Sequence, residues 1–269
     1  MKLAISNLAW GAEQDEAAYE KMQRYGFSGL EIAPTRIFPV QPYQKLDAAR
    51  EWSKKLREKC GFAVPSLQSI WYGRKEHLFG GGKERETLKE YTAGAIAFAE
   101  AVGAKNIVFG SPKNRALPEG HPELAQRIGV PFFSDLAIRA ASAGVTVGIE
   151  ANPPIYGTNY LTRTQDVLSL LQGLRQPGIG LNLDVGTMVE NHESAEMLRG
   201  YVHEISHVHI SEPYLVPVQS RPLHKALAKV LREEGYGGFV SIEMKRVDDL
   251  SVLDEAMAYV KEVFGNEDL

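Results

Sequence analysis

The sequence predicts a single-domain (β/α)₈ TIM barrel over residues 1–269, and three observations lead to this fold class. The chain has 269 residues, close to the roughly 250 residues that are usual for this fold. Short apolar runs alternate eight times with longer amphipathic runs. Several amphipathic runs end in a glycine just before the next apolar run, as at Gly26 and Gly103. Because glycine adopts the left-handed conformation that ends many helices, the alternation indicates repeated strand–helix units.

The apolar runs are expected to be parallel strands, because each is joined to the next through a helix and short links. The expected strands are Leu3–Ser6, Gly29–Ala33, Ala63–Ile70, Asn106–Gly110, Val145–Glu150, Ile179–Asp184, Ile205–Ile210 and Phe239–Glu243. The expected helices lie near residues 13–25, 45–59, 84–102, 121–142, 163–173, 192–201, 221–234 and 249–263. No linker rich in serine or glycine divides these units, so we expect one domain.

A doubly wound open sheet is the structural alternative. Such a sheet usually carries a glycine-rich, phosphate-binding turn after its first strand. Here that turn is Asn7-Leu8-Ala9-Trp10-Gly11, which lacks the glycine pattern. The turn therefore favours the barrel and argues against a dinucleotide-binding protein.

Composition narrows the classes of partner. The net charge of −4 gives no electrostatic reason to expect binding to nucleic acid. No apolar stretch approaches the roughly 18 residues of a membrane span, and the N-terminus lacks the apolar region of a signal peptide. Cys60 is the only cysteine, which suits a reducing compartment. We expect a cytoplasmic protein with a small-molecule partner, and the pattern leaves a homo-oligomer open.

Four polar residues fall at or near the ends of the last four expected strands. They are Glu150, Asp184, His209 and Glu243. Strand residues alternate between the barrel interior and the helix layer. In residues 146–150 the apolar Val147 and Ile149 alternate with the face that carries Glu150, and the other three strands show the same parity. The four side chains are therefore expected to converge at the carboxyl-terminal mouth, where active sites of this fold lie.

A divalent metal ion would resolve the repulsion among three carboxylates in a poorly solvated mouth. Three oxygen donors and one imidazole favour a hard, six-coordinate ion. Mn²⁺ is our first choice, with Mg²⁺, Co²⁺ and Zn²⁺ as alternatives. Each acidic residue taken singly could instead cap a helix or form an ion pair. Four such residues at four consecutive strand ends favour the metal site.

At these strand ends the chain resembles the xylose isomerase-like barrel superfamily, in particular its sugar (phosphate) isomerase/epimerase branch. The matching segments are Gly148-Ile149-Glu150-Ala151-Asn152-Pro153, Leu183-Asp184-Val185-Gly186-Thr187, His207-Val208-His209-Ile210-Ser211-Glu212, Ser241-Ile242-Glu243-Met244 and, at the second strand, Gly29-Leu30-Glu31-Ile32-Ala33. The overall pattern covers essentially the whole chain, while the specific motifs lie in residues 145–245.

The resemblance implies a metal-dependent isomerase or epimerase of a sugar or sugar-like substrate. Glu150 and Glu243 would bind the metal and also exchange protons with the substrate, and Asp184 and His209 would be further ligands. The chemistry is plausible independently, because a metal-bound carbonyl makes the neighbouring C–H acidic and stabilises the resulting enediolate. Carboxylates on opposite faces of that carbon would remove a proton on one side and return it on the other.

The sequence departs from the resembled branch at two places. Many relatives have Asp-x-x-His at the sixth strand, whereas this chain has Thr187 in place of the histidine. The epimerases carry Glu-Asn-x-Arg after the seventh strand, whereas Glu212 is followed here by Pro213-Tyr214-Leu215. Both departures leave the metal ligands intact and indicate a substrate other than a free ketohexose.

Basic and aromatic residues in the expected upper loops suggest a phosphorylated or carboxylated substrate, because arginine forks favour such anions. The candidate substrate-binding residues are Asn152, Lys113, Arg115, Glu212, Trp71 and Arg246. Solvated loop charges and packing of the barrel rim are the alternative explanations. Glu31 is expected to orient other site residues, and His207 to be a hydrogen-bonded core histidine.

Other functions compete with the isomerase. A metal-dependent lyase or dehydratase acting on a keto-sugar or keto-acid would begin with the same proton abstraction. A non-catalytic sugar-binding barrel would not need two proton-transfer carboxylates. DNA-repair endonucleases of the superfamily need extra histidines at strands two and three, where this chain has Glu31-Ile32-Ala33 and Gln68-Ser69-Ile70.

Overall fold

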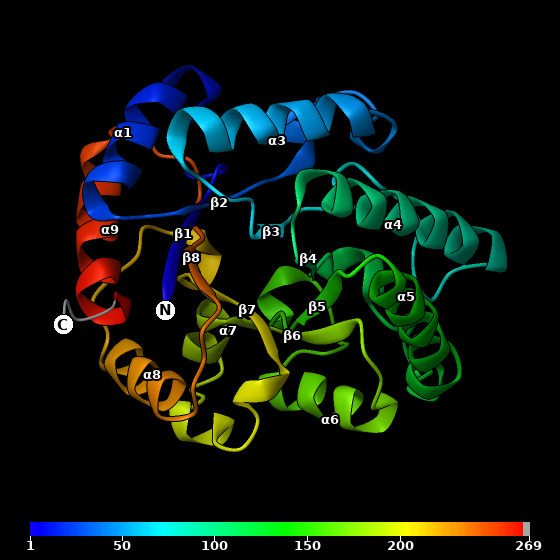
Figure 1. The fold of residues 1–269 in the computed structure, drawn as a ribbon. Helices are drawn as coiled ribbons and strands as arrows, with labels where there is room; N and C mark the ends of the chain where they lie inside the picture. The colour runs from blue at the N-terminus through cyan, green and yellow to red at the C-terminus, as the bar shows by residue number, and fades with distance from the viewer. Residues whose placement is uncertain (266–269) are drawn as a thin grey trace.

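Eight parallel strands form one sheet that closes into a barrel (Figure 1). The structure, a computed structural model, describes residues 1–265, so the last four residues of the expected domain lie outside it. The strands are β1 (Lys2–Ser6), β2 (Gly29–Glu31), β3 (Ser66–Leu67), β4 (Asn106–Phe109), β5 (Thr146–Glu150), β6 (Ile179–Asp184), β7 (Ile205–Ile210) and β8 (Phe239–Ile242), in the order β2-β1-β8-β7-β6-β5-β4-β3.

The barrel closes between β2 and β3 through a short seam. Leu30 N donates to Ala63 O over 2.9 Å, and Gln68 N donates to Ile32 O over 2.9 Å. Two isolated bridges, Gly29 to Ala63 and Ile32 to Leu67, accompany these bonds. The predicted single-domain TIM barrel is therefore confirmed, and the open doubly wound sheet is excluded.

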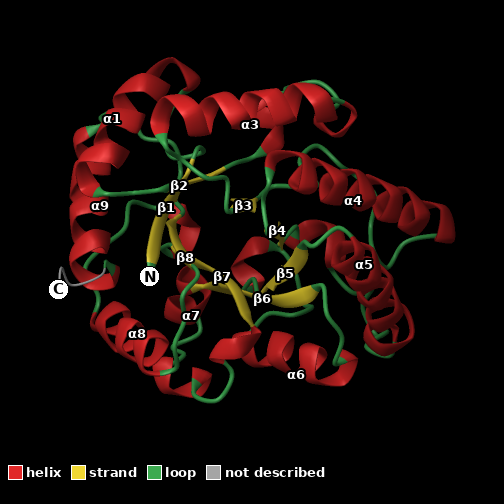
Figure 2. Ribbon diagram, in the orientation of Figure 1, coloured by secondary structure: helices red, strands yellow, loops and turns green. Residues whose placement is uncertain are grey.

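Helices surround the sheet on its outer side (Figure 2). They are α1 (Asp15–Tyr25), α2 (Pro34–Ile37), α3 (Leu46–Cys60), α4 (Gly82–Val102), α5 (Val130–Ser142), α6 (Thr164–Leu174), α7 (Val185–Glu190), α8 (Pro222–Glu233) and α9 (Ser251–Phe264). Their apolar faces bury the outward-facing strand residues, among them Val147, Ile149 and Leu183. Over residues 1–265, no helix is both long and apolar enough to cross a bilayer.

Three expected elements differ from the structure. The strand expected over residues 63–70 is shortened to Ser66–Leu67, because Pro65 has no N–H to donate and Ser69 has a positive φ of 54°. The helix expected over 121–142 becomes regular only at Val130, after a π-helical turn at Ala125–Gly129. The missing N–H of Pro131 accounts for this late start.

The prediction of a helix over residues 192–201 is wrong. After β6 the chain forms α7 at once, with Asp184 as its N-cap, and only the 3₁₀ turn Ala195–Leu198 lies in the expected range. His192 has a φ of 55°, and this left-handed residue separates the two segments. The strand end that carries Asp184 therefore passes directly into a helix, which fixes the direction of its carboxylate.

The barrel interior is polar, whereas the apolar core lies between sheet and helices. Buried side chains inside the barrel include Ser66, Asn106 and Asn182. Asn106 Nδ2 donates to Ser66 Oγ over 3.0 Å. Because buried polar groups are stable only when hydrogen-bonded, these residues link the strands below the mouth and support the side chains above them.

The backbone conformation at Gly178, just before β6, requires a glycine, and this requirement can be tested. Gly178 has a φ of +82°, and a Cβ there would lie 2.1 Å from Ala137 O. We expect Gly178→Ala to lower the free energy of unfolding by more than about 1 kcal/mol. Gly173, in α6, has no atom within 4 Å of an added Cβ. Gly173→Ala should be neutral or stabilising in urea denaturation, and equal losses in both variants would contradict the steric explanation.

Candidate metal centre

The four residues expected at the strand ends meet at the mouth of the barrel. Glu150 ends β5, Asp184 ends β6, His209 lies in β7, and Glu243 follows β8. One donor atom from each lies within 4.8 Å of the others. His209 Nδ1 is 3.0 Å from Glu150 Oε1 and 3.1 Å from Glu243 Oε2. Consecutive parallel strands with the same parity thus bring four distant residues to one point.

The electrostatics of this cluster are those of crowded negative charge. Burial, followed by repulsion from Glu150 and Glu243, raises the pKa of Asp184 to about 7. Burial likewise raises the pKa of Glu243. Burial alone would lower the pKa of His209, but Glu243 and Glu31 outweigh it and hold that pKa well above 6.5. A cation is therefore favoured at the centre of the cluster.

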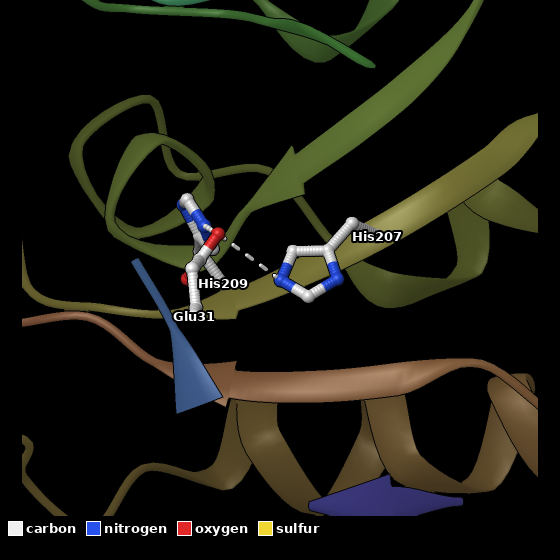
Figure 3. A group of neighbouring side chains, drawn as sticks. All are labelled: Glu31, His207 and His209. Atoms are coloured by element: carbon white, nitrogen blue, oxygen red, sulfur yellow. Dashed lines mark hydrogen bonds and ion pairs between the residues drawn. The ribbon is translucent and has the colours of Figure 1, made fainter. Parts of the chain in front are cut away.

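Glu31 lies beneath the cluster and holds His209 from the other side (Figure 3). Its Oε1 is 3.0 Å from His209 Nε2, and Ser241 Oγ donates to its Oε2 over 2.8 Å. Burial opposes the charge of Glu31, yet His209 and His207 hold its pKa well below 4.5. An ionised Glu31 keeps a proton on Nε2, so Nδ1 is the nitrogen that faces the other carboxylates.

His207 is buried, as the sequence indicates, but without the expected hydrogen bond at Nε2. This atom lies 3.4 Å from Glu31 Oε1, within ion-pair distance, and forms no hydrogen bond within residues 1–265. Figure 3 shows the ring beside Glu31, which stands between His207 and His209. His207 therefore faces the same oxygen of Glu31 as His209 does, from inside the barrel.

The carboxylate of Asp184 is held by hydrogen bonds from the start of α7 and from the residue that follows β7. Thr187 N donates to Asp184 Oδ1 over 2.6 Å, and Ser211 Oγ donates to Asp184 Oδ2. Gly186 N in turn donates to Ser211 Oγ over 2.9 Å. The side chain of Thr187 turns away from the carboxylate and donates to Ala151 O over 2.7 Å. Thr187 thus ties the loops after β5 and β6 together.

Two asparagines fix Glu150. Asn182 Nδ2 donates to Glu150 Oε1 and Asn152 Nδ2 donates to Glu150 Oε2, each over 2.9 Å. The two amides donate to different oxygens of the carboxylate, and they leave its remaining lone pairs to other partners. Asn182 shares the face of Asp184 in the sequence, but nothing in the sequence indicates that it supports Glu150.

The donor set fits a divalent ion. Three carboxylates and one imidazole converge, and Glu150, Asp184 and His209 are each oriented by a further hydrogen bond, as is usual around metal ligands. No thiolate lies near them, because Cys60 is at the end of α3, so oxygen-preferring ions suit the cluster. Glu150, Asp184, His209 and Glu243 are the residues that would hold the ion.

Arg115 occupies a different place from the substrate contact that we expected. The side chain is wholly buried, and burial lowers its pKa to about 10. Its Nη2 donates to Glu150 O over 2.8 Å, to Asn152 Oδ1 over 3.0 Å and to Leu161 O over 3.3 Å. Nη2 of the guanidinium thus braces the loops behind Glu150 by donating to protein oxygens, whereas Nε has no hydrogen-bond partner within residues 1–265. One of these oxygens is Oδ1 of Asn152, which we also expected to bind substrate.

Three further residues expected to bind substrate have protein partners. Trp71 is buried against Phe109, with ring centroids 4.7 Å apart, and its Nε1 donates to Thr92. Glu212 is buried and paired with Arg221. Arg246 lies on the exposed surface, where it pairs with Glu13 and Asp248.

Lys113 remains exposed, and its stem lies beside Gly157 in the loop after β5. Neither an ion pair nor a hydrogen bond of its ammonium group is found within residues 1–265. Among the basic residues expected to bind an anion, Lys113 is therefore the one whose charge faces solvent near the upper loops.

Comparison with known proteins places the barrel in a family. Residues 19–263 match the family described as xylose isomerase-like TIM barrel. The chain belongs to this family. No curated protein matches the sequence.

Solved structures show how widely this barrel is shared. A 3-keto-D-glucoside 4-epimerase from E. coli superposes with a TM-score of 0.79 at 18% identity, over 97% of this chain and 99% of that one. A D-psicose 3-epimerase from Clostridium cellulolyticum has a TM-score of 0.76 at 17% identity, over 99% and 100% of the two chains. A D-allulose 3-epimerase from Methylomonas has a TM-score of 0.75 at 17% identity, over 98% and 97%.

Glu31 should control metal affinity. Glu31→Gln removes the charge that fixes the His209 tautomer, so we expect Mn²⁺ affinity to fall about 10- to 100-fold in calorimetry. Glu212→Gln is the matched control, because Glu212 is also a buried carboxylate but pairs with Arg221. Equal affinities in the wild type and Glu31→Gln would contradict the orienting role.

Metal affinity should also depend on pH. Because the pKa of Asp184 is raised to about 7, its proton competes with the ion below pH 7 and ceases to compete above it. We expect Mn²⁺ affinity to fall about tenfold per pH unit, for each proton displaced, as pH falls below about 7. Ser211→Ala removes a bond that lowers this pKa and should move the midpoint upward. A flat profile from pH 5.5 to 7.5 would refute the expectation.

Proposed function

We propose that the protein is a divalent-metal-dependent isomerase or epimerase of a sugar or sugar-like substrate. The single observation that carries the proposal is the approach of two glutamates, from different strands, to one imidazole nitrogen. Glu150 and Glu243 approach His209 Nδ1 from β5 and from the end of β8, at 3.0 and 3.1 Å. A substrate bound between these strands would have one carboxylate on each side.

The proposed chemistry is proton transfer beside a carbonyl. A bound divalent ion, Mn²⁺ as first choice, would polarise the carbonyl and stabilise the charge of an enediolate. Glu150 or Glu243 would take the proton from the adjacent carbon. Return of a proton by the second glutamate from the opposite face would invert that carbon, which is epimerisation. Return to the neighbouring carbon would give an isomer.

The residues around the two glutamates support these roles. Asn152 and Asn182 donate to the two oxygens of Glu150 and hold its carboxylate in one orientation, which suits a positioned base. Burial raises the pKa of Glu243, which favours a carboxyl group that can carry a proton. This difference in surroundings assigns proton removal to Glu150 and proton return to Glu243 in the forward direction.

The substrate class follows from chemistry and from the relatives' names. The structural neighbours include enzymes acting on a keto-glucoside and on ketohexoses, so a carbonyl-bearing sugar is the proposed substrate. A phosphate or carboxylate group on it would have Lys113 as its cation, since Arg115 and Arg246 are engaged with protein oxygens.

Proton exchange in D₂O tests the proposal. The Mn²⁺-loaded protein is incubated with ketoses, sugar phosphates and keto-acids, and the carbon-bound protons are followed by NMR. We expect deuterium incorporation together with an epimer or isomer. Glu150→Gln keeps a ligand oxygen but cannot remove the proton, so it should slow exchange by about 10²- to 10⁴-fold. Glu243→Gln cannot return a proton from the opposite face, so it should slow formation of the epimer or isomer by a similar factor.

The metal content of each variant serves as the control. Asp184→Asn should lose the ion and the exchange together, whereas the two glutamine variants are compared at measured, equal metal loading. Exchange that persists in both loaded glutamine variants would overturn the assignment. An unsaturated product would replace the isomerase with the lyase or dehydratase.

A further inference from the structure

The loop after β7 bridges the mouth of the barrel. From Glu212 it runs through the 3₁₀ turn Pro213–Leu215. Tyr214 N donates to the Tyr156 hydroxyl, on the loop after β5, over 2.8 Å. Lys245 N, just beyond β8, donates to Leu215 O over 2.8 Å. The loop is therefore tied at two points to the loops that carry Glu150 and Glu243.

Tyr156 lies close to the metal centre. Burial raises its pKa to about 12, and the nearby charges of Asp184, Glu243 and Glu150 act in the same direction. The half-buried ring thus stands near three of the four residues that would hold the ion. Its hydroxyl accepts a hydrogen bond from the Tyr214 backbone N–H, and the faces of its ring take no part in this bond.

Tyr214 is held in a conformation that packing alone does not require. Its φ is 62° and that of Leu215 is 57°, two consecutive left-handed residues that are not glycine. Backbone strain of this kind concentrates at functional sites. Nevertheless the ring is 55% exposed. It lies 6.3 Å from the Tyr156 ring at an interplanar angle of 61°, so the two rings form an open angle.

We propose that Tyr156 and Tyr214 form an aromatic subsite that binds a second ring of the substrate. The inference rests on the proposed function, because it places the reacting sugar at the metal centre below. The apolar C–H face of a pyranose, or an aryl group, packs against tyrosine rings, while the ring edges tolerate water. The preferred substrate is accordingly a glycoside that bears a carbonyl, rather than a free monosaccharide.

The two tyrosine side chains are uncharged and favour a neutral ring at the subsite itself, while Lys113, beside Gly157, is the cation that stays available to an anionic group elsewhere on the substrate. Arg221 is paired with Glu212, and Arg246 is paired with Glu13. Exposed apolar side chains flank the pair instead, namely Ile155 and Val216. These few side chains are too small a surface for a stable dimer, which buries about 800 Å² on each partner. One ring of a ligand is small enough to be covered by these side chains.

Binding to the metal-free protein tests the subsite separately from catalysis. Phenyl β-D-glucopyranoside and methyl β-D-glucopyranoside are titrated by saturation-transfer NMR. We expect the phenyl glycoside to bind about three- to tenfold more tightly, from the energy of one aromatic contact. Tyr214→Ala should abolish this preference, and Tyr214→Phe, which keeps the ring and the backbone bond to the Tyr156 hydroxyl, should retain it.

Tyr72→Ala is the matched control, since Tyr72 is an exposed tyrosine that follows β3, on the opposite side of the barrel. Equal affinity of the wild type for both glycosides, no detectable binding of either, or an unchanged preference in Tyr214→Ala would overturn the subsite. A dimer that Tyr214→Ala dissociates, without any glycoside preference, would assign the rings to a second copy and also overturn it. Absence of deuterium exchange with an intact preference would refute the proposed function alone.

Discussion

The crowding of three carboxylates around the buried imidazole of His209 is the constraint on which the upper half of the barrel depends. Each carboxylate is costly to bury alone, and for two of the three the barrel supplies hydrogen-bond donors from neighbouring strands and loops. Ser211 serves Asp184, and Asn152 and Asn182 serve Glu150. The interior is consequently polar, and the apolar packing that stabilises the fold is displaced to the layer between sheet and helices.

The four residues of the centre were predictable because they follow a simple rule. Strands of the same parity, joined through helices, must present the same face at the same end. Glu31 obeys this rule as well, since it ends β2 and points into the barrel toward His209. The fold was predictable for the same reason, apart from the segment after β6. There the capping of α7 by Asp184 outweighs the amphipathic pattern further along the chain.

The partners of the loop residues were not predictable, because loops have no period. The guanidinium of Arg115 bonds to oxygens of residues that are 35 to 46 positions away in sequence. A buried arginine of this kind has the same sequence signature as one that faces a substrate. Tyr156 and Tyr214 come together through one backbone N–H and one hydroxyl, and the only trace in the sequence is the altered run after Glu212.

Glu31 has a second role, because it lies next to the seam between β2 and β3. Few backbone bonds close the barrel there, and Glu31 is the last residue of β2. Its carboxylate reaches across the lumen to His209 on β7, which is not a neighbour of β2 in the sheet. Ion binding and closure of the β2–β3 seam are therefore thermodynamically linked. An ion that orders His209 also favours the closed seam, and opening of the seam weakens ion binding.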